Sequence, residues 1–228
     1  MKKLVTITAI FTSLLLLSTS ALALNIGTDI TIFDRFKDDS AEAWYNHTGE
    51  DQDVEPGATT GQAWDLEAMY YGNGVFSVIG GYDFVNGQDG IFHGDLFLGL
   101  DGDEKYGQPA VNNTYDNKNT YNNFGWDLAV DLDFQSMTYK VFAVNEQSVF
   151  SSVKYQQFTP SSPYRYEWGG QYLGSGTISY MTGLTDAETG LTGGLHNLFS
   201  IDLSVYLQDN IFLAHMTMGC GNDMLMGQ

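Results

Sequence analysis

The chain has 228 residues, of which 28 are Asp or Glu and only 9 are Lys or Arg, so its formal net charge is −19 at pH 7. Such a charge repels nucleic acid and anionic membrane surfaces, and we expect neither as a partner. Intrinsic disorder is also disfavoured, because 43% hydrophobic and 14% aromatic residues suffice for a packed core.

The N-terminus has the layout of a secretory signal peptide. Lysines precede an apolar run from Leu4 to Leu17, and Ala21-Leu22-Ala23 offers small residues at the cleavage positions. We predict a signal peptide over residues 1–23 and one β-sandwich domain over residues 24–228, secreted or at the cell surface after cleavage near Ala23. No later stretch is apolar for long enough to span a bilayer, so no integral membrane segment is expected in the mature chain.

From Ile30 onward, short runs rich in aromatic and β-branched residues alternate with polar positions and are separated by Gly, Asn, Asp and Pro. This pattern is typical of strands joined by turns. Between Trp126 and Phe134, for example, every second residue is apolar, which predicts one strand face in the core and one in water. The candidates in chain order are ITIF, AWDLEAMYY, VFSVIGGYDF, GDLFLGL, WDLAVDLDF, TYKVFAV, QYLGSGTISYM, LFSIDLSVYL and IFLAHMTM.

About nine strands without a helical period predict an all-β fold, namely an antiparallel two-sheet sandwich that is jelly-roll-like. A closed barrel is the alternative, because the sequence does not show where strands change sheets. Residues 38–57, which are acidic, and residues 112–123, which are rich in Asn, interrupt the strands. We expect both to be long surface loops.

The best candidate for a metal site is the stretch GDLFLGLDGDEKYG. A strand ends there in a glycine turn that is crowded with carboxylates, and carboxylate oxygens are ligands that Ca²⁺ prefers. The predicted calcium ligands are Asp95, Asp101, Asp103 and Glu104. The spacing is not that of an EF-hand, since Lys105 and Tyr106 stand where an acid or Asn and then Gly belong. An ordinary polar hairpin turn is the other interpretation, because Asp-Gly is common in turns.

Catalytic patterns are absent from the sequence. The acids of EDQDVEPG, residues 50–57, are crowded enough for a second ion site but also fit a solvated loop. The four histidines lack zinc-ligand spacing, and Cys220 has no neighbour in sequence that would activate it as a nucleophile. We therefore predict a protein that is not an enzyme and has no catalytic residue. Paired carboxylates of a glycoside hydrolase stay open as an alternative, because their separation in space decides.

Aromatic residues suggest a second hypothesis, a glycan-binding module. Trp64 and Trp126 are in register with apolar strand positions, so we assign them to the core. Trp44 and the YRYEWGG stretch at residues 164–170 are less clearly tied to a core and are free for sugar stacking. A pocket rather than composition would define such a site.

The closing GCGNDMLMGQ contains the only cysteine, Cys220, which is a candidate for a disulfide between two chains. The segment has the register of a calcium-binding nonapeptide, but that structure needs stacked copies and only one is present. We expect it to be the last strand and turn of the sandwich. Asn222 and Asp223 would then cap a turn or, in a weaker hypothesis, supply metal oxygens.

A resemblance covers nearly all of the predicted domain. The ordered segments EDQDVEPG, QAWDLEAMYY, GGYDFVNG, GDLFLGLDGD, GWDLAVDLDF, YKVFAVN, SPYRYEWGG, GTISYM, GGLHNLFSIDLS and FLAHMTMGCGNDMLMGQ resemble bacterial PEP-CTERM proteins, the exosortase-dependent surface proteins. In such proteins a Val-Pro-Glu-Pro signal, an apolar helix and a short basic tail follow a segment similar to HMTMGCGNDMLMG.

The resemblance implies export and association with the envelope or extracellular polysaccharide, and it implies no established enzymatic activity. The sequence stops at Gln228, before any sorting tail, so exosortase anchoring is not carried over. We expect either that the reading frame continues into a sorting signal or that the protein is released. The first hypothesis is thus a non-enzymatic secreted or cell-surface β-sandwich, stabilised by calcium, with exopolysaccharide or other envelope components as partners.

Overall fold

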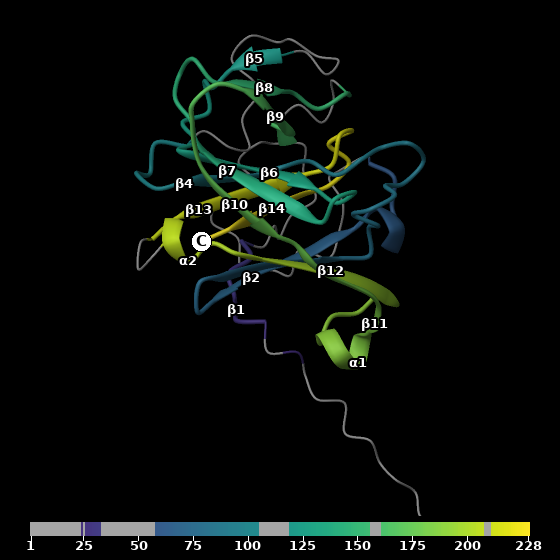
Figure 1. The fold of residues 1–228 in the computed structure, drawn as a ribbon. Coiled ribbons are helices and arrows are strands. Elements are labelled where there is room, and N and C mark those ends of the chain that lie inside the picture. Colours follow the sequence, from purple (N-terminus) through teal and green to yellow (C-terminus); the bar gives the residue numbers. More distant parts are fainter. Residues whose placement is uncertain (1–23, 25, 33–57, 105–118, 156–160, 208–210) are drawn as a thin grey trace, which may run out of the picture.

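A computed structural model of the protein describes residues 24, 26–32, 58–104, 119–155, 161–207 and 211–228 (Figure 1). The predicted signal peptide, the acidic residues 38–57 and most of the Asn-rich segment lie outside these residues. Among the described helices, none has both the length and the apolar character needed to cross a membrane.

The described residues form an all-β structure of three antiparallel sheets, which confirms the predicted class. The five-stranded sheet has the order β1 (Thr28–Asp29), β2 (Leu66–Gly72), β3 (Val75–Gly80), β12 (Leu195–Asp202) and β11 (Ser179–Thr185). The six-stranded sheet has the order β10 (Gln171–Thr177), β7 (Thr138–Ala143), β6 (Leu128–Asp133), β4 (Leu96–Gly99), β13 (Leu213–Thr217) and β14 (Met224–Gly227). The three-stranded sheet has the order β5 (Asn119–Tyr121), β8 (Val149–Ser151) and β9 (Arg165–Trp168).

Helical structure is confined to single turns in the described part of the chain. These are a 3₁₀ turn, η2 (Gln62–Trp64), and two short helices, α1 (Asp186–Thr189) and α2 (Ser204–Leu207). The tightest hairpin joins β2 and β3 through Asn73 (φ 52) and Gly74 (φ 82). Positive φ at both central residues is the backbone that an Asn-Gly pair favours, and it matches the twist of the flanking strands.

The sheets lie in layers, with the six-stranded sheet in the middle (Figure 1). The main core fills the space between the six-stranded and five-stranded sheets and contains Leu96, Leu98 and Val130 from the former and Phe76 and Phe199 from the latter. A second core lies on the other side of the six-stranded sheet. There Phe97 and Ala129 pack with Phe150 and Tyr166 of the three-stranded sheet.

Two details of the sequence prediction were wrong. The described residues contain 14 strands rather than about nine. They form no closed barrel, which was the alternative and not the main prediction. The alternating face of residues 126–134 also differs from the prediction. Leu128, Val130 and Leu132 do face the main core, but Ala129 on the opposite face is fully buried under the third sheet instead of facing water. The strands of that third sheet have three or four residues each, too few for a clear alternating pattern.

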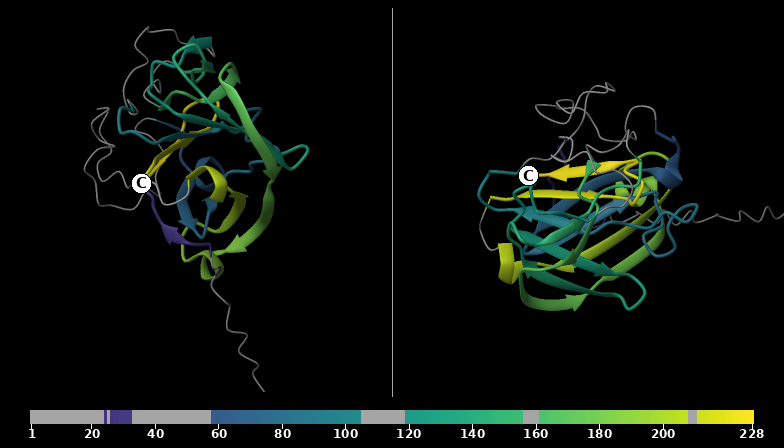
Figure 2. Two further views of the ribbon diagram at one scale, coloured as in Figure 1. Left: turned by 60° about the vertical axis from the view of Figure 1, so that its left-hand side comes forward. Right: turned by 90° about the horizontal axis from the view of Figure 1, so that it is seen from above.

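The N-terminal segment links the two large sheets. Thr28 and Asp29 pair with β2, and two residues later Thr31 bridges to Gly227 of β14. The Ile32 amide donates to the Met226 carbonyl at 2.8 Å, which extends this contact along the six-stranded sheet. On the opposite side a single residue, Ile178, joins β10 of one sheet to β11 of the other. Figure 2 shows this continuous green ribbon running between the sheets.

The closing GCGND turn has a structural role. Asn222 forms two hydrogen bonds with the backbone of Thr59, at 2.8 and 2.9 Å. Asp223 is 1% exposed and accepts the amides of Leu66, the first residue of β2, and of Met224. The turn therefore ties the end of the six-stranded sheet to the start of β2, in keeping with the predicted last turn and strand.

Replacing Asp223 by Asn should destabilise the fold by about 1–3 kcal/mol, because the new NH₂ group would face a backbone donor inside the protein. Chemical denaturation measures this change. Asp89→Asn is the matched control, since Asp89 is exposed and Asn tolerates its positive φ of 51°. Equal denaturation midpoints for the two variants would contradict the structural role of Asp223.

Cys220 is buried, with 3% of its surface exposed. A disulfide between two folded chains would therefore require local opening, and the Cys220-linked dimer stays a prediction. We expect the thiol to react slowly with Ellman's reagent in the native protein and quickly in denaturant. Fast reaction under native conditions would show that the thiol is accessible in the folded protein, as a Cys220-linked dimer requires.

Candidate functional site

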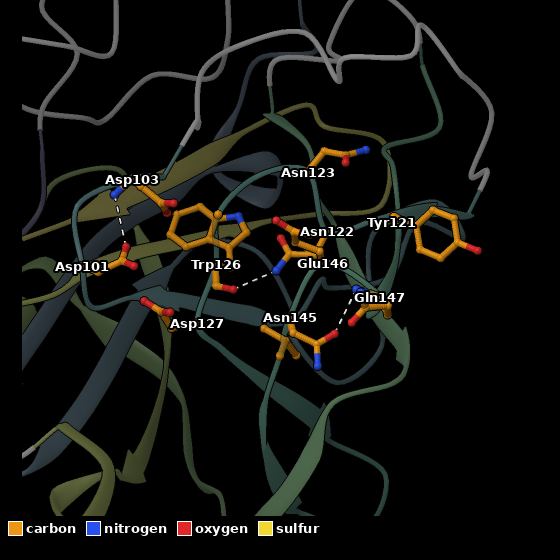
Figure 3. A pocket seen from close by; sticks show the side chains of 12 residues that line it. Asp101, Asp103, Tyr121, Asn122, Asn123, Trp126, Asp127, Asn145, Glu146 and Gln147 are labelled. Atoms are coloured by element: carbon orange, nitrogen blue, oxygen red, sulfur yellow. Dashed lines mark hydrogen bonds between the residues drawn. The ribbon is translucent and has the colours of Figure 1, made fainter.

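An open groove of about 820 Å³ lies beside the three-stranded sheet (Figure 3). Three segments form its walls: the turn after β4, the connection between β5 and β6, and the loop that follows β7. Polar side chains dominate the lining. The lining residues are Asp101, Asp103, Tyr121, Asn122, Asn123, Gly125, Trp126, Asp127, Val144, Asn145, Glu146 and Gln147.

Carboxylates cluster at one end of this groove, where Asp101 and Asp127 line it; Glu104 is not among the lining residues and lines a smaller neighbouring pocket together with Asp101. Asp101, Glu104 and Asp127 each offer an oxygen, and these three oxygens lie within 4.8 Å of one another. Backbone donors fix two of the three side chains. The Leu100 amide donates to Asp127 Oδ2 at 2.6 Å, and the Asp103 amide donates to Asp101 Oδ1 at 3.2 Å within the turn at Gly102.

Glu104 stands out within this cluster. Both of its carboxylate oxygens are buried, and neither has a hydrogen-bond partner among the described residues. Burial raises the pKa of Glu104; the nearby backbone amides of Glu104 and Gly102 oppose this increase, and the charges of Asp101 and Asp127 reinforce it. The pKa of Asp127 is raised by the same causes, first burial and then the charges of Asp101 and Asp103. Without a cation the cluster holds like charges in a partly dry place, which is electrostatically unfavourable.

A divalent cation would relieve this repulsion. Three carboxylates at such short separations are oxygen donors of the type that calcium takes, and calcium's six to eight ligands leave places for backbone carbonyls, water or a bound hydroxyl. The donor set contains neither histidine nor cysteine, so it suits hard cations better than zinc. The residues present therefore fit calcium.

The structure does not bring the four predicted calcium ligands together at one place. Asp101 and Glu104 belong to the cluster, and Asp103 lies beside it on the groove wall. The Asp103 side chain lies close to the backbone of Gly125: a Cβ atom added to Gly125 would lie 2.5 Å from Oδ1 of Asp103. Asp127 was not among the four predicted ligands, because the sequence places it with Asp131 and Asp133 on the outer face of a strand, which either contributes to a site or merely keeps the sheet soluble. Its position follows from the pairing of Leu98 with Leu128, which sets Asp127 beside the end of β4.

Asp95 lies at the other end of β4 and is not part of the cluster. It is fully buried, and its carboxylate accepts the Leu132 amide of β6 at 3.0 Å and the Tyr166 amide of β9 at 2.8 Å. Burial, reinforced by the nearby Asp131, raises the pKa of Asp95 to about 7. Its prediction as a calcium ligand is replaced by a structural role, because both oxygens already bind backbone donors that join two sheets.

A second polar cluster is built on the five-stranded sheet, outside the groove. His196 of β12 is fully buried and contacts Glu67 of β2 at 2.6 Å through Nδ1 and Asp186 of α1 at 3.0 Å through Nε2. Gln62 also donates to Glu67, at 3.0 Å. Both imidazole nitrogens are engaged by carboxylates, so this arrangement fits a structural clamp between strands better than a catalytic base.

No protein-family model, curated protein sequence or solved structure matches the chain. The geometry of the described residues thus has to carry the functional argument.

The His196 clamp predicts a pH dependence. Burial alone would lower the pKa of His196, but its hydrogen bonds to Glu67 and Asp186 outweigh burial and raise it. The stabilisation is then fully present below about pH 6.5, the unfolded-state value, and is lost as pH rises through the folded-state pKa. We expect His196→Gln to cost the most stability near pH 6 and progressively less toward pH 9, as measured by chemical denaturation.

His93→Gln is the control for this experiment. Burial lowers the pKa of His93 to about 4, so folded His93 is neutral throughout that pH range. The unfolded chain binds a proton at this histidine below about pH 6.5 and the folded chain does not, so His93→Gln should cost less stability at pH 6 than at pH 9, the opposite trend to His196→Gln. A His196→Gln effect that is flat, or that follows the His93→Gln trend, would show that His196 acts through packing and not through charge.

Proposed function

We propose that the protein is a non-enzymatic secreted or cell-surface component of a bacterial envelope or extracellular polysaccharide matrix, stabilised by calcium. The five-stranded and six-stranded sheets are the two layers that a sandwich requires, and we assign the domain to that class, jelly-roll-like, with the three-stranded sheet as an added cover. Export and the polysaccharide setting rest on the signal-like N-terminus and on the resemblance to PEP-CTERM proteins.

The observation that carries the proposal is the cluster of Asp101, Glu104 and Asp127, whose buried Glu104 oxygens have no partner among the described residues. Calcium is abundant outside cells, so an exported protein with such a cluster has the ion at hand. An ion that binds only the folded state raises stability by mass action.

A carbohydrate-active hydrolase is the alternative of the enzyme class. It needs two carboxylates on either side of the bond to be broken, one protonated and one ionised. The oxygens of Asp101, Glu104 and Asp127 instead converge on one point. Convergence of this kind favours an ion over a bond that must fit between two groups.

Calcium should raise the unfolding midpoint of the purified protein, and a chelator should reverse the rise. At a calcium concentration a hundredfold above the dissociation constant, the expected gain is about 2.7 kcal/mol. Asp127→Asn should abolish the gain, because it removes one ligand charge while its amide oxygen still accepts the Leu100 amide. Thermal denaturation with calcium or chelator measures the difference.

Asp202→Asn is the matched control, since Asp202 is an exposed carboxylate on β12 outside the cluster. It should respond to calcium like the unaltered protein. Absence of a calcium response in the unaltered protein, or an equal response in Asp127→Asn, would refute the cation site. Recovery of the native protein in the cytoplasmic fraction of its cells would refute the proposed location.

A further inference from the structure

The part of the groove away from the carboxylates has features that a cation site does not explain. Figure 3 shows Asp101, Asp103 and Asp127 at one end and Tyr121 at the other, with Trp126 between them. Tyr121 is 62% exposed although it ends strand β5. Exposed aromatic rings on a rigid strand are flat apolar surfaces that a ligand can cover.

Two buried polar atoms in the lining lack partners among the described residues: the amide oxygen Oδ1 of Asn122 and the indole nitrogen Nε1 of Trp126. Asn122 is 5% exposed and Trp126 is 1% exposed. An unsatisfied buried polar group costs about 1–3 kcal/mol, so two of them in one groove call for a partner beyond the described residues.

Neither side chain is free to turn away. The Asn122 amide nitrogen donates to the Trp126 carbonyl at 2.8 Å, and its backbone amide donates to the Ser148 carbonyl at 2.8 Å. The Trp126 ring is stacked on His215, with ring centroids 5.6 Å apart. The open acceptor and the open donor are therefore fixed in place.

These two atoms restrict the chemistry of the ligand. Asn122 Oδ1 needs a donor, whereas Trp126 Nε1–H needs an acceptor. A hydroxyl group serves as either, while a carboxylate or phosphate only accepts and an ammonium group only donates. A ligand with many hydroxyl groups matches this groove best.

The charge of the groove restricts the chemical class of the ligand further. Four carboxylates line the groove, those of Asp101, Asp103, Asp127 and Glu146, and no Lys or Arg is among the lining residues. Anionic polymers would be repelled, whereas the amides of Asn123, Asn145 and Gln147 can both donate to and accept from neutral hydroxyls.

We propose that this groove binds a neutral saccharide, with Tyr121 stacked on a sugar ring, Asn122 and Trp126 bonded to hydroxyl groups, and calcium at the acidic end. The inference rests on the proposed function and specifies the chemical class of its polysaccharide partner. Calcium would strengthen the binding, because it neutralises the acidic end and has coordination places left for sugar hydroxyls.

Isothermal titration of the purified exported protein tests the proposal. The neutral probes are the hexasaccharides of β-1,4-glucose, β-1,3-glucose, β-1,4-mannose and β-1,4-xylose, and the anionic probes are oligogalacturonate and oligoalginate, each with calcium and with chelator. We expect at least one neutral probe to bind, more tightly with calcium. Tyr121→Ala should weaken that binding about tenfold or more.

Tyr155→Ala is the matched control, since Tyr155 is a 42% exposed tyrosine that does not line the groove, and it should leave binding unchanged. Trp126→Phe keeps an aromatic ring but removes the indole N–H, and it should weaken saccharide binding. The unfolding midpoint of this variant shows whether it is folded. Binding of none of the neutral probes, binding of anionic probes alone, or equal effects of Tyr121→Ala and Tyr155→Ala would overturn the inference. A calcium-stabilised protein that binds none of the probes would leave the cation site standing and remove only the saccharide.

Discussion

The six-stranded sheet has apolar side chains on both faces, and the rest of the structure follows from the need to cover both. In β4, Leu96 and Leu98 face the five-stranded sheet while Phe97 between them faces the opposite way. A sheet with one face in solvent needs only one partner layer to bury its apolar face. This sheet has two apolar faces and needs a layer on each side. The three-stranded sheet supplies the second cover, and Asp95 fastens it by accepting the backbone amides of Leu132 in β6 and Tyr166 in β9.

The covering sheet also creates the groove. β5 ends at Tyr121, and the chain then has to return to β6 of the central sheet. Along this return lie Asn122, Trp126 and Asp127, so one connection contributes a fixed amide, an anchored indole and a carboxylate to the same hollow. Trp126 takes part in both tasks: its ring fills the second core, and its N–H, beside the groove, has no partner within the described part of the chain. The position of the site is thus a by-product of how the central sheet is covered.

Much of the fold could be predicted from local patterns, because strand alternation is a property of neighbouring residues. The strands around Leu128 and Ile201 follow directly from such patterns. Trp126 is buried as predicted, but in the second core and not with Leu128 in the main core. The third sheet could not be predicted, since its strands are short and its cover over Ala129 depends on contacts between distant segments. The same limit applies to the cation cluster: the turn at Asp101 and Glu104 was visible in the sequence, but Asp127 joins it only through the pairing of β4 with β6.

Buried carboxylates elsewhere in this acidic protein show how it normally stabilises them. Asp95 and Asp223 each accept two backbone amides, and Glu67 is held by His196 and Gln62. Each of these groups has exchanged water for fixed donors, which is the general condition for burying a charge. Glu104 is different, because its buried oxygens lie near other carboxylates and make no well-formed hydrogen bond to any described residue, although the backbone amides of Glu104 and Gly102 are close by. Asp95, Asp223 and Glu67 thus have fixed donors, whereas Glu104 is left for a positive charge from outside, and the ion would lie next to the end of the groove that Asp101 and Asp127 line.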